Sequence, residues 1–153
     1  MAKLQKLLKR SPADLLLLIK VVGLLVIVDC GLRLLPLPRL QAILARRRWR
    51  WRTPQTVEER LLGRLVWAVD VSGWYGGASC LKKALTLQWL LSRRGVSSRL
   101  WLGVQSEEAT LRAHAWLEHD GSVIIGGAVA EGYTPLHGFD GGDALAMNMG
   151  RDR

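Results

Sequence analysis

Apolar residues dominate the beginning of the chain. The run from Leu15 to Val28 is interrupted by a single charge, Lys20, and it follows the tetrapeptide Ser11-Pro12-Ala13-Asp14. This tetrapeptide is typical of a helix start, because Ser11 can cap the helix and proline suits its first position. The run lacks a small-residue cleavage site and is shorter than the ~20 residues that span a bilayer. We therefore predict a buried core helix, with attachment to a membrane surface as the alternative.

Two more helices are predicted before residue 70. The first covers residues 40–47, and the second presents its apolar positions, Leu61 to Val69, on one face. The glycine-rich segment Val71 to Ser79 is predicted to be a loop. Trp74 and Tyr75 within it have two open interpretations: they line a substrate groove, or they pack on a glycine-rich turn.

The pattern changes from helical to extended in the second half of the chain. A helix is predicted to begin at Cys80, after glycine and serine, and to end at Gly95. The apolar period then becomes two, as in a strand, with Leu100 and Leu102 on one face and Trp101 on the other.

A hairpin is predicted around Asp120-Gly121, a dipeptide typical of two-residue turns. His114 and Trp116 share one face of its first strand. Numbers of cross-strand partners in such a hairpin add to 241, so His114 is predicted to face Gly127.

Length and composition favour one domain of the α+β class. A chain of 153 residues with 49% hydrophobic content can bury a core. We expect a basic helical N-terminal part over residues 1–55, packed on a small antiparallel sheet within the core, residues 56–136. Residues 137–153 are predicted to be a Gly-rich, mobile tail.

Positive charge is concentrated in the N-terminal third. Residues 1–55 carry twelve Lys/Arg against two Asp, whereas the whole chain has a net charge of +9. The stretch Arg46 to Arg52 interleaves arginine with Trp49 and Trp51. Such a patch can bind nucleic acid, an anionic membrane surface or an acidic partner. The alternative interpretation is a solvated basic helix end. No nucleic-acid module accompanies it, so nucleic-acid binding is not expected.

The chemistry-bearing candidates are Cys80 and His114. A thiol on the first turn of a helix lies at the positive end of the helix dipole, which favours the thiolate, and Lys82 and Lys83 add positive charge. His114 is the candidate base. The two cysteines, Cys30 and Cys80, suit a reducing compartment, and their spacing predicts no metal site and no cofactor.

Two motifs carry a resemblance to a known family. They are C-L-x-x-A-L-x-L-Q-W-L-L-x-R-R-G from Cys80 and A-H-A-W-x-E-x-D-G from Ala113. Together they resemble the transglutaminase-like (papain-like) cysteine peptidases of lasso-peptide biosynthesis, which are related to the C-terminal domain of the microcin-processing protein. The resemblance is close from about Leu65 to Leu136.

The resemblance implies a cytoplasmic peptidase that cuts the leader from a ribosomally made precursor. The basic N-terminal third leaves contact with the inner face of the membrane as an open alternative. Cys80 would attack the scissile carbonyl and His114 would act as base. A separate leader-recognition protein and an ATP-dependent macrolactam synthetase are the implied partners.

The chain departs from the family at the third catalytic position. The resemblance implies an acid about twelve residues beyond the histidine, where Gly126 and Gly127 stand here. A backbone carbonyl or Glu131 are the open replacements. Two alternatives therefore remain: a non-catalytic scaffold that binds peptides, and a basic membrane or nucleic-acid adaptor.

Overall fold

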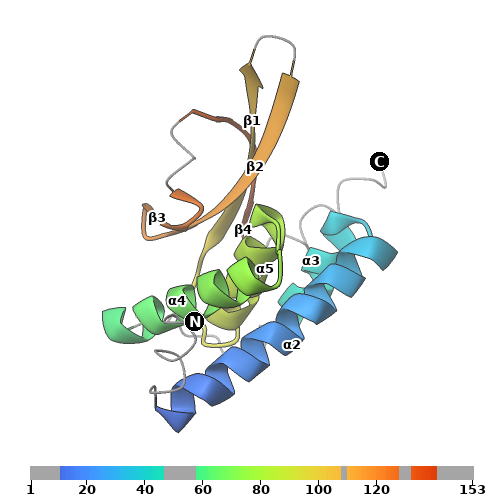
Figure 1. Cartoon of the computed structure of the whole chain (residues 1–153). Helices are drawn as coiled ribbons and strands as arrows, with labels where there is room; N and C mark the ends of the chain where they lie inside the picture. Colours follow the sequence, from blue (N-terminus) through green and yellow to red (C-terminus); the bar gives the residue numbers. More distant parts are fainter. Residues whose placement is uncertain (1–10, 47–57, 108–109, 128–131, 141–153) are drawn as a thin grey trace.

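Four helices precede a four-stranded antiparallel sheet in the part of the chain that the computed structural model describes, residues 11–46, 58–107, 110–127 and 132–140 (Figure 1). This arrangement confirms the predicted α+β class. The helices are α2 (Pro12–Leu34), α3 (Leu37–Arg46), α4 (Glu59–Tyr75) and α5 (Cys80–Ser92). The strands are β1 (Arg99–Glu107), β2 (Thr110–His119), β3 (Ser122–Ile125) and β4 (Thr134–Asp140), in the order β3-β2-β1-β4.

Helix α5 is the centre of the core. It packs on β2 and β1 on one side and on α2 and α4 on the other (Figure 1). Eight of its thirteen residues are buried, which is why its apolar residues are spread around the helix rather than along one stripe. The fully buried large side chains that meet here come from all of these elements: Val21, Val28, Leu65, Leu85, Leu87, Leu91, Leu100 and Leu117.

Helix α2 begins as predicted. Ser11 is its N-cap and accepts a hydrogen bond from the Ala13 backbone N–H, with Pro12 at the first helical position. The helix continues beyond Val28 to Leu34, just before Pro36. Only one of its sides is buried, so the prediction of a buried core helix holds for that side alone.

Helix α4 extends further than the sequence pattern indicated. It continues through Trp74 and Tyr75, where a loop was predicted, and the connection shrinks to residues 76–79. The stem of Lys83 from α5 lies where a side chain of Gly73 would be, so this glycine allows α4 and α5 to approach closely. Gly77 then adopts a positive φ of 61° and turns the chain towards α5. Of the predicted basic patch, Arg46 is the last residue of α3, and residues 47–52 lie outside the described part.

The hairpin turn forms as predicted, but its register changes along the strands. Asp120 and Gly121 both have positive φ, 48° and 76°, as a two-residue hairpin turn requires. The pair His119–Ser122 follows the predicted register, whereas Leu117 pairs with Ile125 because a bulge shifts β3 by one residue. The predicted pairing of His114 with Gly127 is therefore wrong.

A fourth strand occupies part of the predicted tail. β4 pairs antiparallel with β1, with Phe139 opposite Leu100 and His137 opposite Leu102. The expected boundary at residue 137 thus falls inside a strand. Side-chain alternation did not reveal this strand, because its TPLHGFD sequence contains both proline and glycine. Residues 141–153 lie outside the described part.

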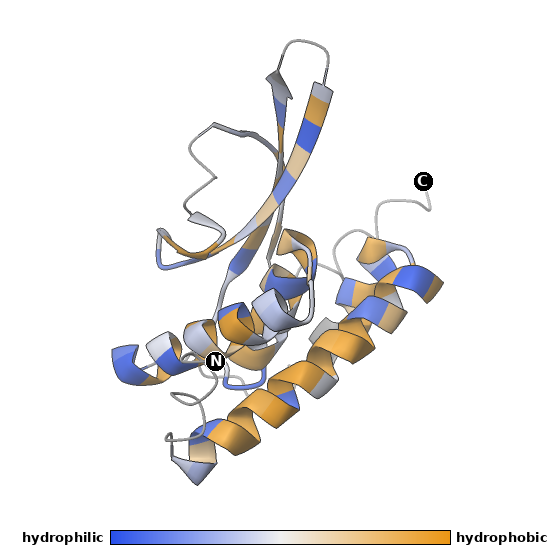
Figure 2. Cartoon of the chain, in the orientation of Figure 1, coloured by the Kyte–Doolittle hydropathy of each residue, from blue (hydrophilic) through white to orange (hydrophobic). Residues whose placement is uncertain are grey.

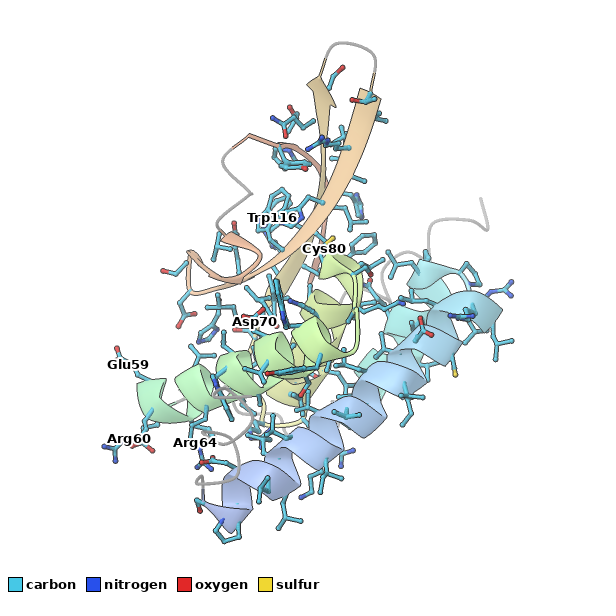
Figure 3. The ribbon with its side chains drawn as sticks, viewed as in Figure 1. Glu59, Arg60, Arg64, Asp70, Cys80 and Trp116 are labelled. Atoms are coloured by element: carbon cyan, nitrogen blue, oxygen red, sulfur yellow. The ribbon has the colours of Figure 1, made fainter. Side chains whose placement is uncertain are left out.

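An ion pair ties the start of α2 to α4. Arg64 donates from Nη2 and Nε to Oδ1 of Asp14, at 2.6 and 3.1 Å. Asp14 is only 9% exposed, so its carboxylate depends on this partner. In Figure 3 the Arg64 side chain reaches towards the start of α2, while Arg60 points away from it.

We expect Arg64→Ala to lower the free energy of unfolding by about 1–3 kcal/mol, because it leaves the buried Asp14 carboxylate without its partner. Urea unfolding followed by circular dichroism measures this change. Arg60→Ala, an exposed arginine on the same helix, is the matched control and should change the value by less than about 0.5 kcal/mol. Equal effects of both substitutions would contradict this role for the ion pair.

Candidate functional site

The sheet has two different faces. Leu100, Ala115 and Leu117 belong to the core and face the helices. Alternation places His114 and Trp116 on the other face, where Trp116 stacks on Trp101 with ring centroids 6.5 Å apart. The two site residues proposed from the sequence are therefore held by different layers, Cys80 by the helical layer and His114 by the sheet.

Cys80 is the first residue of α5 (Figure 3). It is a free thiol, half-buried, and packs against the hydrophobic core. Ser79 is the N-cap residue, but its side chain makes no capping hydrogen bond. The N–H groups of the first helical turn lack intrahelical partners by geometry, so they remain available to an anionic group next to Cys80.

The two lysines that follow Cys80 are both paired. Lys82 forms an ion pair with Asp29 of α2, and Lys83 donates to Oδ1 of Asp70 of α4 at 2.9 Å. Their charges are therefore largely neutralised, which corrects the expectation that they add positive charge for the thiolate. The two pairs link α5 to α2 and to α4.

His114 is fixed by a backbone carbonyl. Its Nε2 lies 2.9 Å from the carbonyl oxygen of Gly126, and its ring lies between Trp116 and Tyr133, with centroids 6.3 and 5.1 Å away. A carbonyl oxygen only accepts, so Nε2 carries the proton. The neutral imidazole then has its lone pair on Nδ1, which is the nitrogen able to act as a base.

Gly126 leaves no room for the acid that the resemblance implied. Its φ is +83°, and a Cβ atom there would lie 2.9 Å from the carbonyl oxygen of Ala115 and 3.0 Å from Cβ of Trp116. A side chain at this position is thus excluded by both the backbone angle and the space. Sequence reasoning named a backbone carbonyl as an open replacement, but the sequence carried no signal that this carbonyl would be that of Gly126.

The structure does not join Cys80 and His114. Neither a hydrogen bond nor a ring contact links them in the part of the chain that the structure describes. Packing of α5 on β2 brings their elements together, but the imidazole is turned towards Gly126.

The remaining histidines have separate environments. His119 donates from Nδ1 to the carbonyl oxygen of Ser97, at 2.7 Å. His137 is opposite Leu102 and so lies on the helix-facing side of the sheet, against Phe139. Sequence reasoning placed His137 in the tail and missed this position.

A groove of about 690 Å³ lies between α4 and β3. Its walls are apolar side chains of both elements, and its floor reaches the backbone of Gly126 and Gly127. Two acidic residues, Glu59 and Asp70, lie at different points along the α4 side (Figure 3). β3 is an edge strand, so one side of its backbone is open to pairing.

No group of three or more His, Cys, Asp or Glu side chains arranged to hold a metal ion occurs among residues 11–46, 58–107, 110–127 and 132–140.

A comparison with protein families gives one match. The model of the transglutaminase-like superfamily matches residues 24–138, from the middle of α2 to β4. Comparisons with curated proteins and with solved structures give no significant match.

We expect the Asp29–Lys82 ion pair to make stability depend on pH. The hydrogen bond from Lys82, with the charge of nearby Arg33, holds the pKa of the Asp29 carboxyl below its ordinary value. A lowered carboxyl pKa stabilises the fold above that ordinary value, and this stabilisation is lost as the pH falls through the lowered pKa. Asp29→Asn should therefore unfold at lower urea than the natural chain near neutral pH, with the difference shrinking in acid. A difference that is independent of pH would contradict this.

We expect Gly126→Ala to lower the free energy of unfolding by about 1–3 kcal/mol, because the new methyl group meets the backbone of β2 in a strained conformation. Gly127→Ala is the matched control, since a Cβ atom there meets only Val123, at 3.3 Å. It should cost less than about 1 kcal/mol. Urea titration followed by tryptophan fluorescence measures both variants, and equal stability of the two would show that Gly126 is not sterically required.

Proposed function

The chain belongs to the transglutaminase-like superfamily, and on this premise we propose that it is a cysteine peptidase. In the proposed reaction it removes the leader from a ribosomally made lasso-peptide precursor. The observation that carries the proposal is the hydrogen bond between His114 Nε2 and the Gly126 carbonyl, since it leaves Nδ1 as a base. Membership of the family supports a cysteine-based reaction, and the two sequence motifs support the substrate class.

The proposed chemistry is acyl transfer to water. Nδ1 of His114 takes the proton from the Cys80 thiol, and the thiolate attacks the scissile carbonyl. The imidazolium then gives this proton to the leaving amine, and water releases the acyl group from sulfur by the same steps. The mechanism requires Nδ1 and Sγ to come within hydrogen-bond reach in the substrate complex, where catalytic hydrogen bonds tighten.

The start of α5 supports a way to stabilise the oxyanion. The N–H of Cys80 belongs to the first helical turn, and Ser79 does not cap that turn through its side chain. These N–H groups and the helix dipole favour negative charge at the carbonyl oxygen under attack. A helix start is suited to this role because its donors are already oriented.

The groove between α4 and β3 is the proposed place for the substrate chain. An extended peptide can add to the open edge of β3, with alternate side chains directed at the apolar wall. Glu59 on the groove wall favours a basic side chain in the bound segment. The Gly126 carbonyl connects this groove to His114.

The partners and compartment follow from the proposed reaction. We place the protein in the cytoplasm, with a separate leader-recognition protein that delivers the precursor and a macrolactam synthetase that closes the ring. The free thiols of Cys30 and Cys80 suit a reducing compartment.

A second function is favoured by one observation. The space at Gly126 excludes a carboxylate beside His114, so a peptide-binding scaffold that does not cut is the alternative. The same groove would then hold the peptide without hydrolysis.

We expect Cys80→Ala to abolish cleavage of a matched precursor, and His114→Ala to lower its rate by about 10²–10⁴-fold, the usual contribution of a general base. Mass spectrometry of a reconstituted reaction, with the leader-recognition protein present, measures both. Cys30→Ala controls for the loss of a thiol, because Cys30 is exposed on α2.

His137→Ala and His119→Ala test whether another histidine is the base. Both variants should cleave the precursor at the rate of the natural chain. A loss confined to His137→Ala would move the base to the helix-facing side of the sheet and reject His114. Cleavage by Cys80→Ala would reject the peptidase, and an intact precursor with the natural chain and its partners would favour the scaffold.

A further inference from the structure

The outer side of α2 is apolar along its length (Figure 2). Six large side chains spaced around this side are 49–80% exposed, and we call them the α2 stripe: Leu16, Ile19, Val22, Val26, Ile27 and Leu34. A contiguous apolar surface of this kind is uncommon on a soluble monomer and marks an interaction surface.

The inner side of α2 is fastened to the rest of the domain. Val21 and Val28 are fully buried against α4 and α5. Asp14 pairs with Arg64 near the start of the helix, and Asp29 pairs with Lys82 in its second half. α2 has the length and composition of a membrane-spanning helix, but crossing a bilayer would break all of these contacts. Among the described residues of α2, the stripe can meet a partner while these contacts stay intact.

The charge around the stripe indicates which partner fits. Lys20 is exposed among the stripe residues, and Arg39 is exposed just beyond its end, whereas the exposed Arg33 is paired with Asp29. The first 55 residues carry twelve Lys/Arg against two Asp. Two copies of such a surface repel each other, whereas a surface of negative headgroups over an apolar interior complements both its charge and its apolar side chains. The long stem of Lys20 allows its ammonium to reach the headgroups while neighbouring side chains enter the apolar layer.

We propose that the α2 stripe docks the protein in plane on an anionic membrane surface. The helix lies along the bilayer with its outer side immersed, as an interfacial helix does, and does not cross it. Val22 and Val26 also line an apolar hollow of about 420 Å³, whose other wall includes Tyr75 at the end of α4 and Ala78 from the turn before Cys80. The sheet lies on the opposite side of α5, so His114 and the groove along β3 remain directed away from the lipid (Figure 1).

Vesicle flotation of the full chain tests this proposal. Vesicles of phosphatidylcholine with phosphatidylglycerol should bind the protein, and pure phosphatidylcholine at least tenfold more weakly. Binding should also weaken as salt rises, because exposed charges are screened. Ile19→Gln/Ile27→Gln should lower binding at least tenfold. The matched control, Leu111→Gln/Leu136→Gln, removes two apolar side chains of similar exposure from the sheet and should bind like the natural chain. Circular dichroism checks that both variants fold.

A label on Cys30 gives the orientation of the helix. Cys30 is exposed on α2, so an environment-sensitive fluorophore can be attached there in a Cys80→Ala background. Its emission should shift to the blue on binding anionic vesicles, whereas the same fluorophore at Arg60→Cys, in a background that also lacks both natural cysteines, should not shift. Because this measurement needs no active thiol, its failure is distinguishable from failure of the proposed peptidase.

Three results would overturn the proposal. The first is no binding to anionic vesicles by the folded natural chain. The second is equal loss of binding in both double variants. The third is self-association without lipid binding, measured by sedimentation velocity and removed by Ile19→Gln/Ile27→Gln, which would assign the stripe to a second copy of the chain.

Discussion

The burial of α5 between the sheet and the other helices is the constraint on which the rest of the structure depends. This one helix provides the start at which Cys80 stands, the apolar support for β2 and β1, and the lysines that hold α2 and α4. A helix that is buried almost all around cannot shift without disturbing each of its neighbours. The position of the thiol relative to the sheet is therefore set by core packing rather than by a local loop.

A backbone carbonyl contacts His114 where the resemblance implied an acidic side chain. The carbonyl of Gly126, a residue of positive φ that follows β3, is the partner of His114 Nε2. A carbonyl fixes the tautomer of an imidazole as a carboxylate does, but it brings no net negative charge to stabilise the imidazolium. The proposed dyad would thus have an oriented base whose protonated form is less stabilised. This is the physical reason for the alternative of a scaffold that binds peptides without cutting them.

The two sides of α2 have different roles, one in the core and one in the proposed docking. Its inner side contributes to the core and is held by two ion pairs, while its outer side leaves large apolar side chains in contact with solvent. The inner contacts are enough to hold this helix in the domain. Covering its exposed apolar side chains with another apolar surface removes them from water, which favours docking. The proposed docking would also keep the peptide groove accessible, since the groove lies between α4 and the sheet edge.

Local chemistry was enough to place the start of α2, the Asp120-Gly121 turn and Cys80 at the beginning of a helix, because capping and turn preferences act over a few residues. Contacts between distant residues decided the rest. The extension of α4 through Tyr75 depends on packing against α5, and β4 exists because β1 offers it an edge. The one-residue bulge shifted the register of β3 away from the one that the turn predicted. The ion pairs of Lys82 and Lys83 largely neutralise the positive charge that the sequence placed near the thiol. Capping and turn formation depend on residues that are neighbours in the sequence. Register, charge pairing and exposure depend on which surfaces the folded chain brings together.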